Sequence, residues 1–385
     1  MTPGARASAA IVVLDRVLAG DPVEVALTDW GRGARYAGSS DRAAVRDIVF
    51  QCLRCRSSCA ALGGGLTGRG LVLGLARREP PNVAWFAGGS HDPQPADPVT
   101  EAGRAPVGAE VFNIPDWLEA PLRASLGTDF AAVMTAMANR APVFLRINPQ
   151  RGGRAEAIAA LARDQITATA RADLPLAVEV TDGERKVKSS AAYLSGLVEL
   201  QDLSSQAVVA ALPLVDGMKV LDHCAGGGGK TLAMAAAAGL RLYAHDAAPR
   251  RMADLPARAL RAGIGVTQLA RPEDAAPFDL VLVDAPCSGS GSWRRDPAGK
   301  WALTEARLDA LLLDQRDILR RAAEMVRPGG WLAYATCSLL SGENDDQVAA
   351  FVADRPGWVL AQRRLWTPLT GGDGFFLAVL SRPDG

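Results

Sequence analysis

The spacing of apolar residues separates a helical first part of the chain from a later part built of alternating strands and helices. Between Ala5 and about Leu75, apolar residues recur at helical intervals, as in AAIVVLDRVL and DRAAVRDIVFQCLRCRSSCAAL, with almost no strand-like alternation. This pattern predicts a small helical domain over residues 1–87. The segment that begins at Gly88, GGSHDPQPADPVTEAGRAPVG, is rich in Pro, Gly and acidic residues, which is typical of a linker or a long loop.

The periodicity changes again after the linker. A helix is expected around residues 114–138, so residues 88–138 are assigned to the linker and a connecting helix. Residues 139–200 contain strand-like PVFLRIN, helical RAEAIAALARD and strand-like LAVEV, and we expect a small α/β module there. Over residues 201–385, the apolar strands KVLDHC, RLYAHD, FDLVLVDAP and WLAYATC alternate with helical stretches such as TEARLDALLLDQRDILRRAAEMV. This alternation predicts an α/β fold with a parallel, doubly wound sheet.

The composition is that of an ordinary folded protein. The chain has 385 residues, of which 49% are hydrophobic and 22% charged. The N-terminal stretch lacks the long apolar region of a secretory signal, and no run approaches the roughly 18 apolar residues of a membrane span. We therefore expect a cytoplasmic, monomeric protein without a membrane partner, in which the six cysteines are core thiols, metal ligands or nucleophiles rather than disulfides.

The charge distribution gives weak information about partners. The net charge is zero, but residues 1–80 carry eleven Arg against seven acidic residues, and residues 139–190 carry nine Arg or Lys against six. This excess fits a surface that follows phosphates, and it fits an ordinary solvated surface equally well.

Chemistry-bearing residues gather where the predicted parallel strands end. KVLDHC runs into the glycine-rich AGGGGKT, the second strand ends at Asp246, the third continues into DAPCSGSGSWRRDP, and the fourth ends in ATCS. Ligands bind outside the carboxyl ends of the strands in such sheets, so the four segments are expected to line one crevice. A phosphate-binding P-loop is excluded, because the glycine it requires five positions before Gly229 is Cys224.

Two cysteines and a carboxylate on one rim suit pyrimidine methylation. A cytosine ring is too electron-poor to attack a methyl sulfonium, but addition of a thiolate to carbon 6 makes carbon 5 nucleophilic. An acid that donates to the ring stabilises the adduct, and a base must then remove the carbon 5 proton so that the thiol can leave. Asp284, Cys287 and Cys337 meet these needs.

The motifs resemble those of the RsmB-type (NSUN-like) RNA cytosine-5 methyltransferases. The resemblance rests on DHCAGGGGKT, DAPCSGSGSWRRDP, ATCS followed by GEND, LQDLSSQ from Leu200, and the C-terminal GGDGFF, and it covers about residues 140–385. The helical N-terminal part resembles the NusB-like domain of the bacterial small-subunit rRNA members. The resemblance implies a Rossmann-type class I methyltransferase domain preceded by an RRM-like α/β module and an all-α NusB-like domain.

The same resemblance implies roles for individual residues. Cys337 would be the nucleophile, Cys287 would assist proton removal or product release, and Asp284 would contact the cytosine. The cofactor would be S-adenosylmethionine. Its expected contacts are Cys224, Ala225, Gly226, Gly227, Gly228, Gly229, Lys230, Asp246, Asp274 and Asp284.

The chain departs from the family pattern in two places. The usual Ala-Pro-Gly-Gly is replaced by four glycines at positions 226–229, which frees a turn that proline would stiffen and is expected to weaken cofactor binding. The family's acidic residue near the adenine aligns with Ala270, and Asp274 is the substitute that we consider.

Other charged and sulfur-bearing residues have simpler interpretations. Arg294 and Arg295, beside the expected cytosine pocket, are predicted to contact RNA phosphates rather than form only a solvated turn. Cys52, Cys55 and Cys59 have the spacing i, i+3, i+7, which places them on one helical face. We favour core packing over a zinc site and expect no bound metal, because the three histidines of the chain lie in unrelated contexts.

The expected substrate is a structured RNA, with 16S rRNA suggested by the resemblance. Three alternatives stay open. They are a tRNA-directed methyltransferase, a DNA cytosine-5 methyltransferase that uses the cysteine of its Pro-Cys motif as nucleophile, and an RNA-binding assembly factor that has lost catalysis.

Overall fold

The chain folds into two compact units. The computed structural model describes residues 1–384, apart from the side chains of Pro80 and Pro81. The first unit comprises Met1–Arg140 together with Trp293–Ala302, and the second comprises Ala141–Ser292 and Leu303–Gly385. Within the described residues, no single helix is long and apolar enough to cross a membrane.

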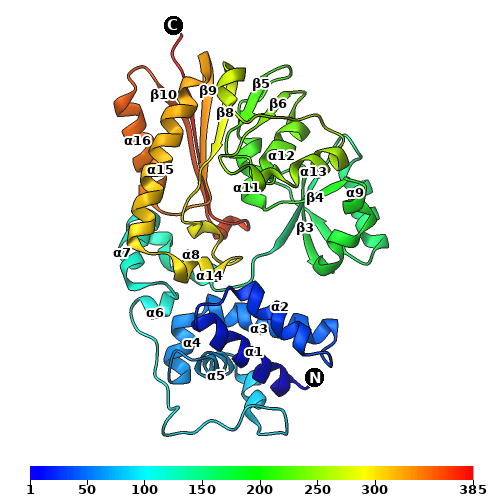
Figure 1. Cartoon of the computed structure of the whole chain (residues 1–385), viewed down its shortest axis with the longest axis vertical. Helices are drawn as coiled ribbons and strands as arrows, with labels where there is room; N and C mark the ends of the chain where they lie inside the picture. The colour runs from blue at the N-terminus through cyan, green and yellow to red at the C-terminus, as the bar shows by residue number, and fades with distance from the viewer. Residues whose placement is uncertain (385) are drawn as a thin grey trace. The chain divides into compact units, whose positions relative to one another are not determined.

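The first unit is helical, as the periodicity predicts (Figure 1). Apolar side chains from several helices, among them Leu14, Val45, Val49 and Leu71, are excluded from solvent and form its core. Its helices are α1 (Pro3–Leu18), α2 (Val23–Gly33), α3 (Ser39–Arg54), α4 (Arg56–Gly63), α5 (Gly68–Arg78), α6 (Ala109–Phe112), α7 (Asp116–Leu126), α8 (Phe130–Met137) and α14 (Pro297–Ala302).

Two local predictions for this unit are wrong. The expected helix over 114–138 is interrupted between α7 and α8 by the short 3-10 turn η2 (Gly127–Asp129), where Gly127 adopts φ +53°. Cys52, Cys55 and Cys59 do not share one continuous helix, because α3 ends before Cys55 and α4 begins after it. All three cysteines are nevertheless buried in the core.

The second unit begins with a small antiparallel module. Its elements follow the order β-α-β-β-α-β of ferredoxin-like folds, and its sheet has the strand order β2-β3-β1-β4. Leu145, Leu161, Val178 and Val198 fill its core. The elements are β1 (Val143–Ile147), α9 (Arg154–Arg163), β2 (Thr167–Ala170), β3 (Ala177–Asp182), α10 (Ala191–Leu194) and β4 (Val198–Leu200).

A mixed seven-stranded sheet makes up the rest of the second unit. Its strand order is β10-β11-β9-β8-β5-β6-β7; the five strands from β9 to β7 run parallel, and β11 is antiparallel to both of its neighbours. The sheet is of the class I methyltransferase type that the resemblance implies, but the prediction of a wholly parallel sheet is wrong at β11, because the short connection over residues 367–374 returns the chain from β10 without a helical crossover. The strands are β5 (Lys219–Asp222), β6 (Arg241–Ala244), β7 (Thr267–Gln268), β8 (Phe278–Asp284), β9 (Val326–Thr336), β10 (Val359–Trp366) and β11 (Phe375–Ser381).

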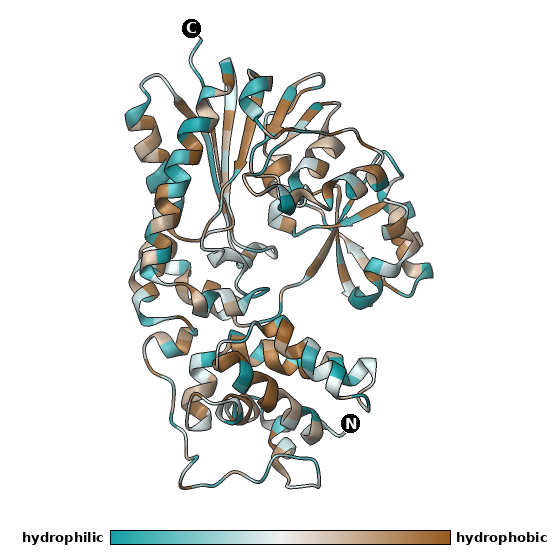
Figure 2. Cartoon of the chain, in the orientation of Figure 1, coloured by the Kyte–Doolittle hydropathy of each residue, from teal (hydrophilic) through white to brown (hydrophobic). Residues whose placement is uncertain are grey.

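Helices cover both faces of this sheet (Figure 1). Leu221 packs on the face covered by α15 and α16, whereas its neighbour Val220 packs on the face covered by α11 and α12. The central strands therefore bury apolar residues on both faces of the sheet, and Figure 2 shows hydrophobic residues along these strands. The polar loops at their carboxyl ends are left to form the rim. The helices are α11 (Leu203–Ala210), α12 (Gly229–Ala237), α13 (Leu255–Ala262), α15 (Glu305–Glu324) and α16 (Asp345–Asp354).

Candidate active site

The glycine-rich loop between β5 and α12 is held in a tight turn. The Gly228 N–H donates to the Ala225 carbonyl at 2.8 Å, and φ is +49° at Gly226 and +80° at Gly228, values that favour glycine. At the base of the loop, the Thr231 hydroxyl donates to the Asp222 carboxylate at 2.6 Å. Burial raises the pKa of Asp222 to about 6.

Asp246, at the end of β6, is tied to this loop. Its carboxylate is 3% exposed and accepts the Gly226 N–H at 3.0 Å and the Ala248 N–H at 2.9 Å. The Arg251 guanidinium lies 3.3 Å from the same carboxylate. The structure thus brings together the two segments that were predicted to enclose one small molecule.

Lys230 connects the loop to the end of β8. Its ammonium group donates to the Asp284 carboxylate at 2.6 Å and lies 4.4 Å from the centre of the Phe375 ring. Lys230 is buried, whereas the Asp284 side chain is 31% exposed. A carboxylate held by an interior cation and still open to solvent can receive a hydrogen bond from a ligand.

Cys287 and Cys337 meet on the same rim. Cys287 follows β8, Cys337 follows β9, and their sulfur atoms lie 3.4 Å apart. Both residues are half-buried rather than fully excluded from solvent. The separation fits an S–H···S hydrogen bond and is well beyond the roughly 2.05 Å of a disulfide.

The two thiols have opposite electrostatic environments. The hydrogen bond from Cys287 lowers the pKa of Cys337, and the nearby Lys230 ammonium and the Ser292 hydroxyl act in the same direction, against burial and the Asp284 carboxylate. The pKa of Cys287 is raised well above its ordinary value by the bond to Cys337 and by burial. Within the pair, Cys337 is therefore the thiol with the lower pKa, the one more readily converted to a nucleophilic thiolate, and Cys287 has the higher pKa.

Some predicted positions lie outside this arrangement. Asp274 lies on the short 3-10 turn η5 (Pro272–Ala275), with its side chain 67% exposed and 3.7 Å from Arg271. Cys224 does lie in the loop, but burial raises its pKa and keeps it protonated, as expected for a packing residue. Arg294 is 4% exposed, so its predicted contact with RNA phosphates does not fit this structure. Arg295 is exposed, as phosphate binding requires.

Sequence reasoning missed the residues that support the site. Glu343 belongs to the GEND motif but received no role, and its buried carboxylate contacts the loops of both cysteines. Gln201, in the LQDLSSQ motif, donates to the Gly229 carbonyl at 3.1 Å and so tethers the glycine-rich loop. Both residues lie inside segments that carry the resemblance to the family, and this was the signal in the sequence that could have identified them.

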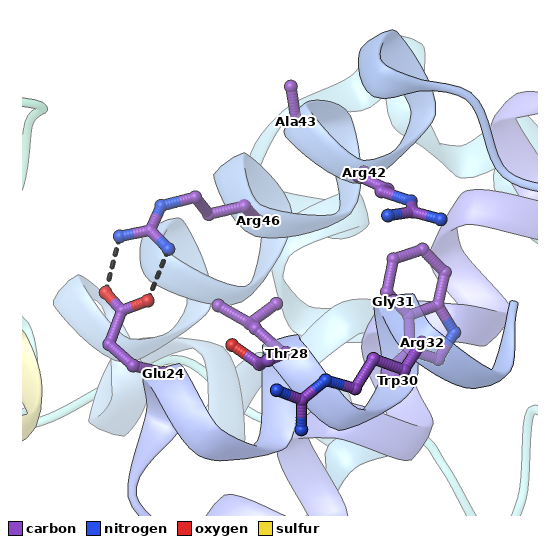
Figure 3. A pocket seen from close by; sticks show the side chains of 9 residues that line it. Glu24, Thr28, Trp30, Gly31, Arg32, Arg42, Ala43 and Arg46 are labelled. Atoms are coloured by element: carbon purple, nitrogen blue, oxygen red, sulfur yellow. Dashed lines mark hydrogen bonds and ion pairs between the residues drawn. The ribbon is translucent and has the colours of Figure 1, made fainter.

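The helical unit carries a separate groove of about 380 Å³ between α2 and α3 (Figure 3). Arg32, Arg42 and Arg46 line it beside the Trp30 ring. Arg46 makes two hydrogen bonds to Glu24, at 2.5 and 2.6 Å. Guanidinium groups next to an aromatic ring suit the phosphates and bases of a nucleic acid strand.

Comparisons with known proteins agree with this description. Residues 209–381 match the family model of the 16S rRNA methyltransferase RsmB/F, and residues 114–187 match its ferredoxin-like domain. Ribosomal RNA small subunit methyltransferase B of Sodalis glossinidius is 35% identical over 69% of the chain, and that of Xanthomonas campestris is 35% identical over 71%. These matches span 64% and 68% of the two relatives' own lengths.

Solved structures share the fold. PH0851 covers 99% of this chain and is itself covered to 99%, with a TM-score of 0.80 and 21% identity. NSun6 from Pyrococcus horikoshii with SFG covers 70% of this chain, and 99% of that protein is matched, with a TM-score of 0.62 and 17% identity.

Proposed function

Because the chain belongs to the RsmB/F family of 16S rRNA methyltransferases, we propose that it methylates carbon 5 of a cytosine in ribosomal RNA through a covalent adduct with Cys337. The observation that carries this proposal is the pair of sulfur atoms 3.4 Å apart at the ends of β8 and β9. Two neighbouring thiols whose pKa values are shifted in opposite directions match a reaction that needs both a nucleophile and a group that assists proton transfer.

The proposed reaction uses the rim residues in sequence. The Cys337 thiolate forms a bond to carbon 6 of the cytosine, which makes carbon 5 nucleophilic toward the methyl group. Asp284, held by Lys230 at 2.6 Å, contacts the polar edge of the ring. Once carbon 5 carries the methyl group, a base takes the carbon 5 proton, the C–H electron pair re-forms the double bond between carbons 5 and 6, and the Cys337 sulfur leaves as a thiolate. Cys287 assists this release.

S-adenosylmethionine would supply the methyl group, and the residues of the loop fit it. One Asp246 carboxylate oxygen accepts the Gly226 N–H of the loop and the other accepts the Ala248 N–H, and both keep acceptor capacity for the hydroxyls of a ribose. The turn at Gly226–Gly229 lets the backbone approach the ligand closely. Lys230 would hold the catalytic carboxylate in place. Asp274, exposed and paired with Arg271, is a poor candidate for the adenine contact.

The RNA partner is proposed on surface chemistry and on the relatives. Relatives named as small subunit ribosomal RNA methyltransferases point to 16S rRNA. The arginine-lined groove of Figure 3 and the exposed Arg295 supply positive charge for phosphates. We further propose the domain limits set from the sequence, with a NusB-like domain over 1–87 and the methyltransferase domain over 201–385.

Covalent trapping tests the proposed mechanism. The full chain is incubated with S-adenosylmethionine and ribosomal RNA containing 5-azacytosine, and the protein–RNA adduct is measured on a denaturing gel. We expect an adduct with the wild type and none with Cys337→Ala. With unmodified RNA, Cys287→Ser should accumulate a methylated adduct that is released slowly.

The alternatives predict different results. If the covalent adduct is lost with Cys287→Ser but kept with Cys337→Ser, the nucleophile is Cys287 of the Pro-Cys motif. That result would support the mechanism of the DNA cytosine-5 methyltransferases. Absence of S-adenosylmethionine binding at millimolar concentration in calorimetry would support an assembly factor without catalysis. Bisulfite sequencing of RNA from cells with and without the gene identifies the methylated RNA. Methylation of tRNA but not of 16S rRNA would show that tRNA is the substrate.

A further inference from the structure

One buried carboxylate lies between the two loops that carry the cysteines. Glu343 ends the 3-10 turn η7 (Ser341–Glu343) ahead of α16, and it is completely excluded from solvent. One of its oxygens accepts the Ser288 N–H at 2.7 Å and the Gln315 side-chain amide at 3.1 Å. The other accepts the hydroxyls of Ser288 and Ser338, both at 2.5 Å.

These contacts join the two halves of the catalytic pair. Ser288 directly follows Cys287 and Ser338 directly follows Cys337, so each thiol is one residue away from a group bonded to the same carboxylate. Gln315, on α15, also donates to the Pro286 carbonyl at 2.9 Å, which ties the Cys287 loop to the same point.

Glu343 is itself held firmly. The Tyr334 hydroxyl donates to the Glu343 carbonyl at 2.6 Å. The next residue, Asn344, accepts the Thr336 hydroxyl at 2.6 Å and donates to the Ser338 carbonyl at 3.0 Å. These hydrogen bonds hold Glu343 in place relative to β9 independently of its contacts with Ser288 and Ser338.

We propose that Glu343 is a positioning residue that sets the separation of the Cys287 and Cys337 sulfur atoms, and so maintains the hydrogen bond between them. This inference rests on the proposed function. The sulfur atoms lie on loops from two different strands, and a thiol hydrogen bond is weak and sensitive to distance. A carboxylate that binds both loops at once removes the freedom by which the sulfur atoms would drift apart.

Loss of this carboxylate should act on the thiols more than on the fold. Backbone hydrogen bonds join the same loops independently, from the Ala285 N–H to the Ala335 carbonyl and from the Gly291 N–H to the Cys337 carbonyl, both at 2.9 Å. The strands therefore stay paired without Glu343. Lys230 and Asp284, the charged groups that face Cys337, are unchanged by the substitution. The Glu343 charge raises the pKa of Cys287, so its removal alone would favour ionisation of the pair, and a higher midpoint for Cys337 would have to come from the lost sulfur–sulfur hydrogen bond.

The test compares Glu343→Ala, Glu343→Gln and the control Gln347→Ala in the full chain. Gln347 is also buried, on α16, but its side-chain amide donates to the Gly342 carbonyl rather than to a cysteine loop. One readout is the pH dependence of Cys337 alkylation by iodoacetamide, followed by mass spectrometry of the peptide that contains it. The other is kcat and KM for methylation of ribosomal RNA.

We expect Glu343→Ala to move the alkylation midpoint to higher pH and to lower kcat by about 10²-fold, since a misplacement near 1 Å costs about that much, with KM for RNA changed less than about threefold. Glu343→Gln should show a smaller effect, because its oxygen still accepts the Ser288 N–H while its amide donates to hydroxyls that can turn. Gln347→Ala should match the wild type in both readouts.

An unchanged alkylation midpoint and kcat in folded Glu343→Ala would overturn the positioning role. Should that variant fail to fold, Ser338→Ala decides, because it keeps the carboxylate and its bonds to Ser288 and must raise the midpoint if the proposal is right. It also removes the contacts of the Ser338 hydroxyl with Ser290 Oγ and the Leu340 N–H, both at 3.0 Å, so Ser290→Ala, which keeps the bond from Ser338 to Glu343, is its control and should leave the midpoint unchanged. Failure of the proposed function is a separate result: wild-type protein would then neither methylate RNA nor form an adduct with 5-azacytosine, whatever the alkylation profiles show.

Discussion

Alanine substitutions at Gly227 and Gly228, in the loop between β5 and α12, test whether stability depends on the backbone conformation of a particular glycine or only on the number of glycines in the loop. Gly228 has φ +80°, and a Cβ there would lie 2.2 Å from Leu255 Cδ1. We expect Gly228→Ala to lower the free energy of unfolding by about 2–5 kcal/mol. About 1–2 kcal/mol comes from placing an L-residue in the left-handed region and about 1–3 kcal/mol from overpacking.

Gly227 is the matched control. Its φ lies outside the left-handed region, and an added Cβ would meet the end of the flexible Arg258 side chain, 2.9 Å from Nη1. Alanine there also restricts the unfolded chain, which favours folding by about 0.4–1 kcal/mol and offsets the displacement of the guanidinium. Gly227→Ala should therefore leave the free energy of unfolding within about 1 kcal/mol of the wild type.

Urea unfolding of the two variants measures this difference, and calorimetry with S-adenosylmethionine measures its effect on the site. Gly228→Ala should also weaken cofactor binding, because the turn positions the N–H groups that line the loop, and Gly227→Ala, which leaves the turn intact, should weaken it less. Equal stability losses at the two positions would refute the reasoning, since only backbone conformation and the Leu255 contact distinguish them.

Three further predictions follow from the same structure. Asp246→Ala should weaken S-adenosylmethionine binding by about 10- to 100-fold in calorimetry, because a charged acceptor contributes about 1.5–3 kcal/mol; unchanged binding would remove Asp246 from the site. Burial lowers the pKa of Lys300 from 10.5 to about 7, so the unfolded chain binds the extra proton and stability rises as pH increases between these values. Lys300→Met should abolish that pH dependence and stabilise the protein by about 1–3 kcal/mol at pH 7. Urea unfolding at pH 7 and 9.5 measures both effects. If the variant keeps the wild-type pH dependence, Lys300 is not its source. Gly291→Ala should destabilise by about 2 kcal/mol or more in thermal unfolding, because its Cβ would lie 2.1 Å from the Gly374 carbonyl oxygen, a backbone atom that cannot rotate away; an unchanged melting temperature would argue against this close approach.

The limits of local reasoning are clearest in the helical unit. Periodicity predicted helices there, but a period of 3.6 residues does not report where a helix stops. The break at Gly127 and the one at Cys55 depend on single backbone conformations and on the packing of the following helix. Arg294 shows the same limit for charge. An Arg-Arg pair in a polar loop predicts exposure, yet one side chain is buried and its neighbour is exposed.

Residue order alone determined the class of fold and the four loops of the rim, because parallel strands joined by helical crossovers must bring their carboxyl ends to one edge. Asp246, Lys230, Asp284 and the two cysteines of the rim, Cys287 and Cys337, were identifiable on that basis. Only the tertiary structure decided that the sulfur atoms of Cys287 and Cys337 are hydrogen-bonded neighbours and that Glu343 lies between their loops. The physical reason is that those distances depend on how residues some fifty positions apart pack around one buried carboxylate, which no local pattern of polar and apolar residues encodes.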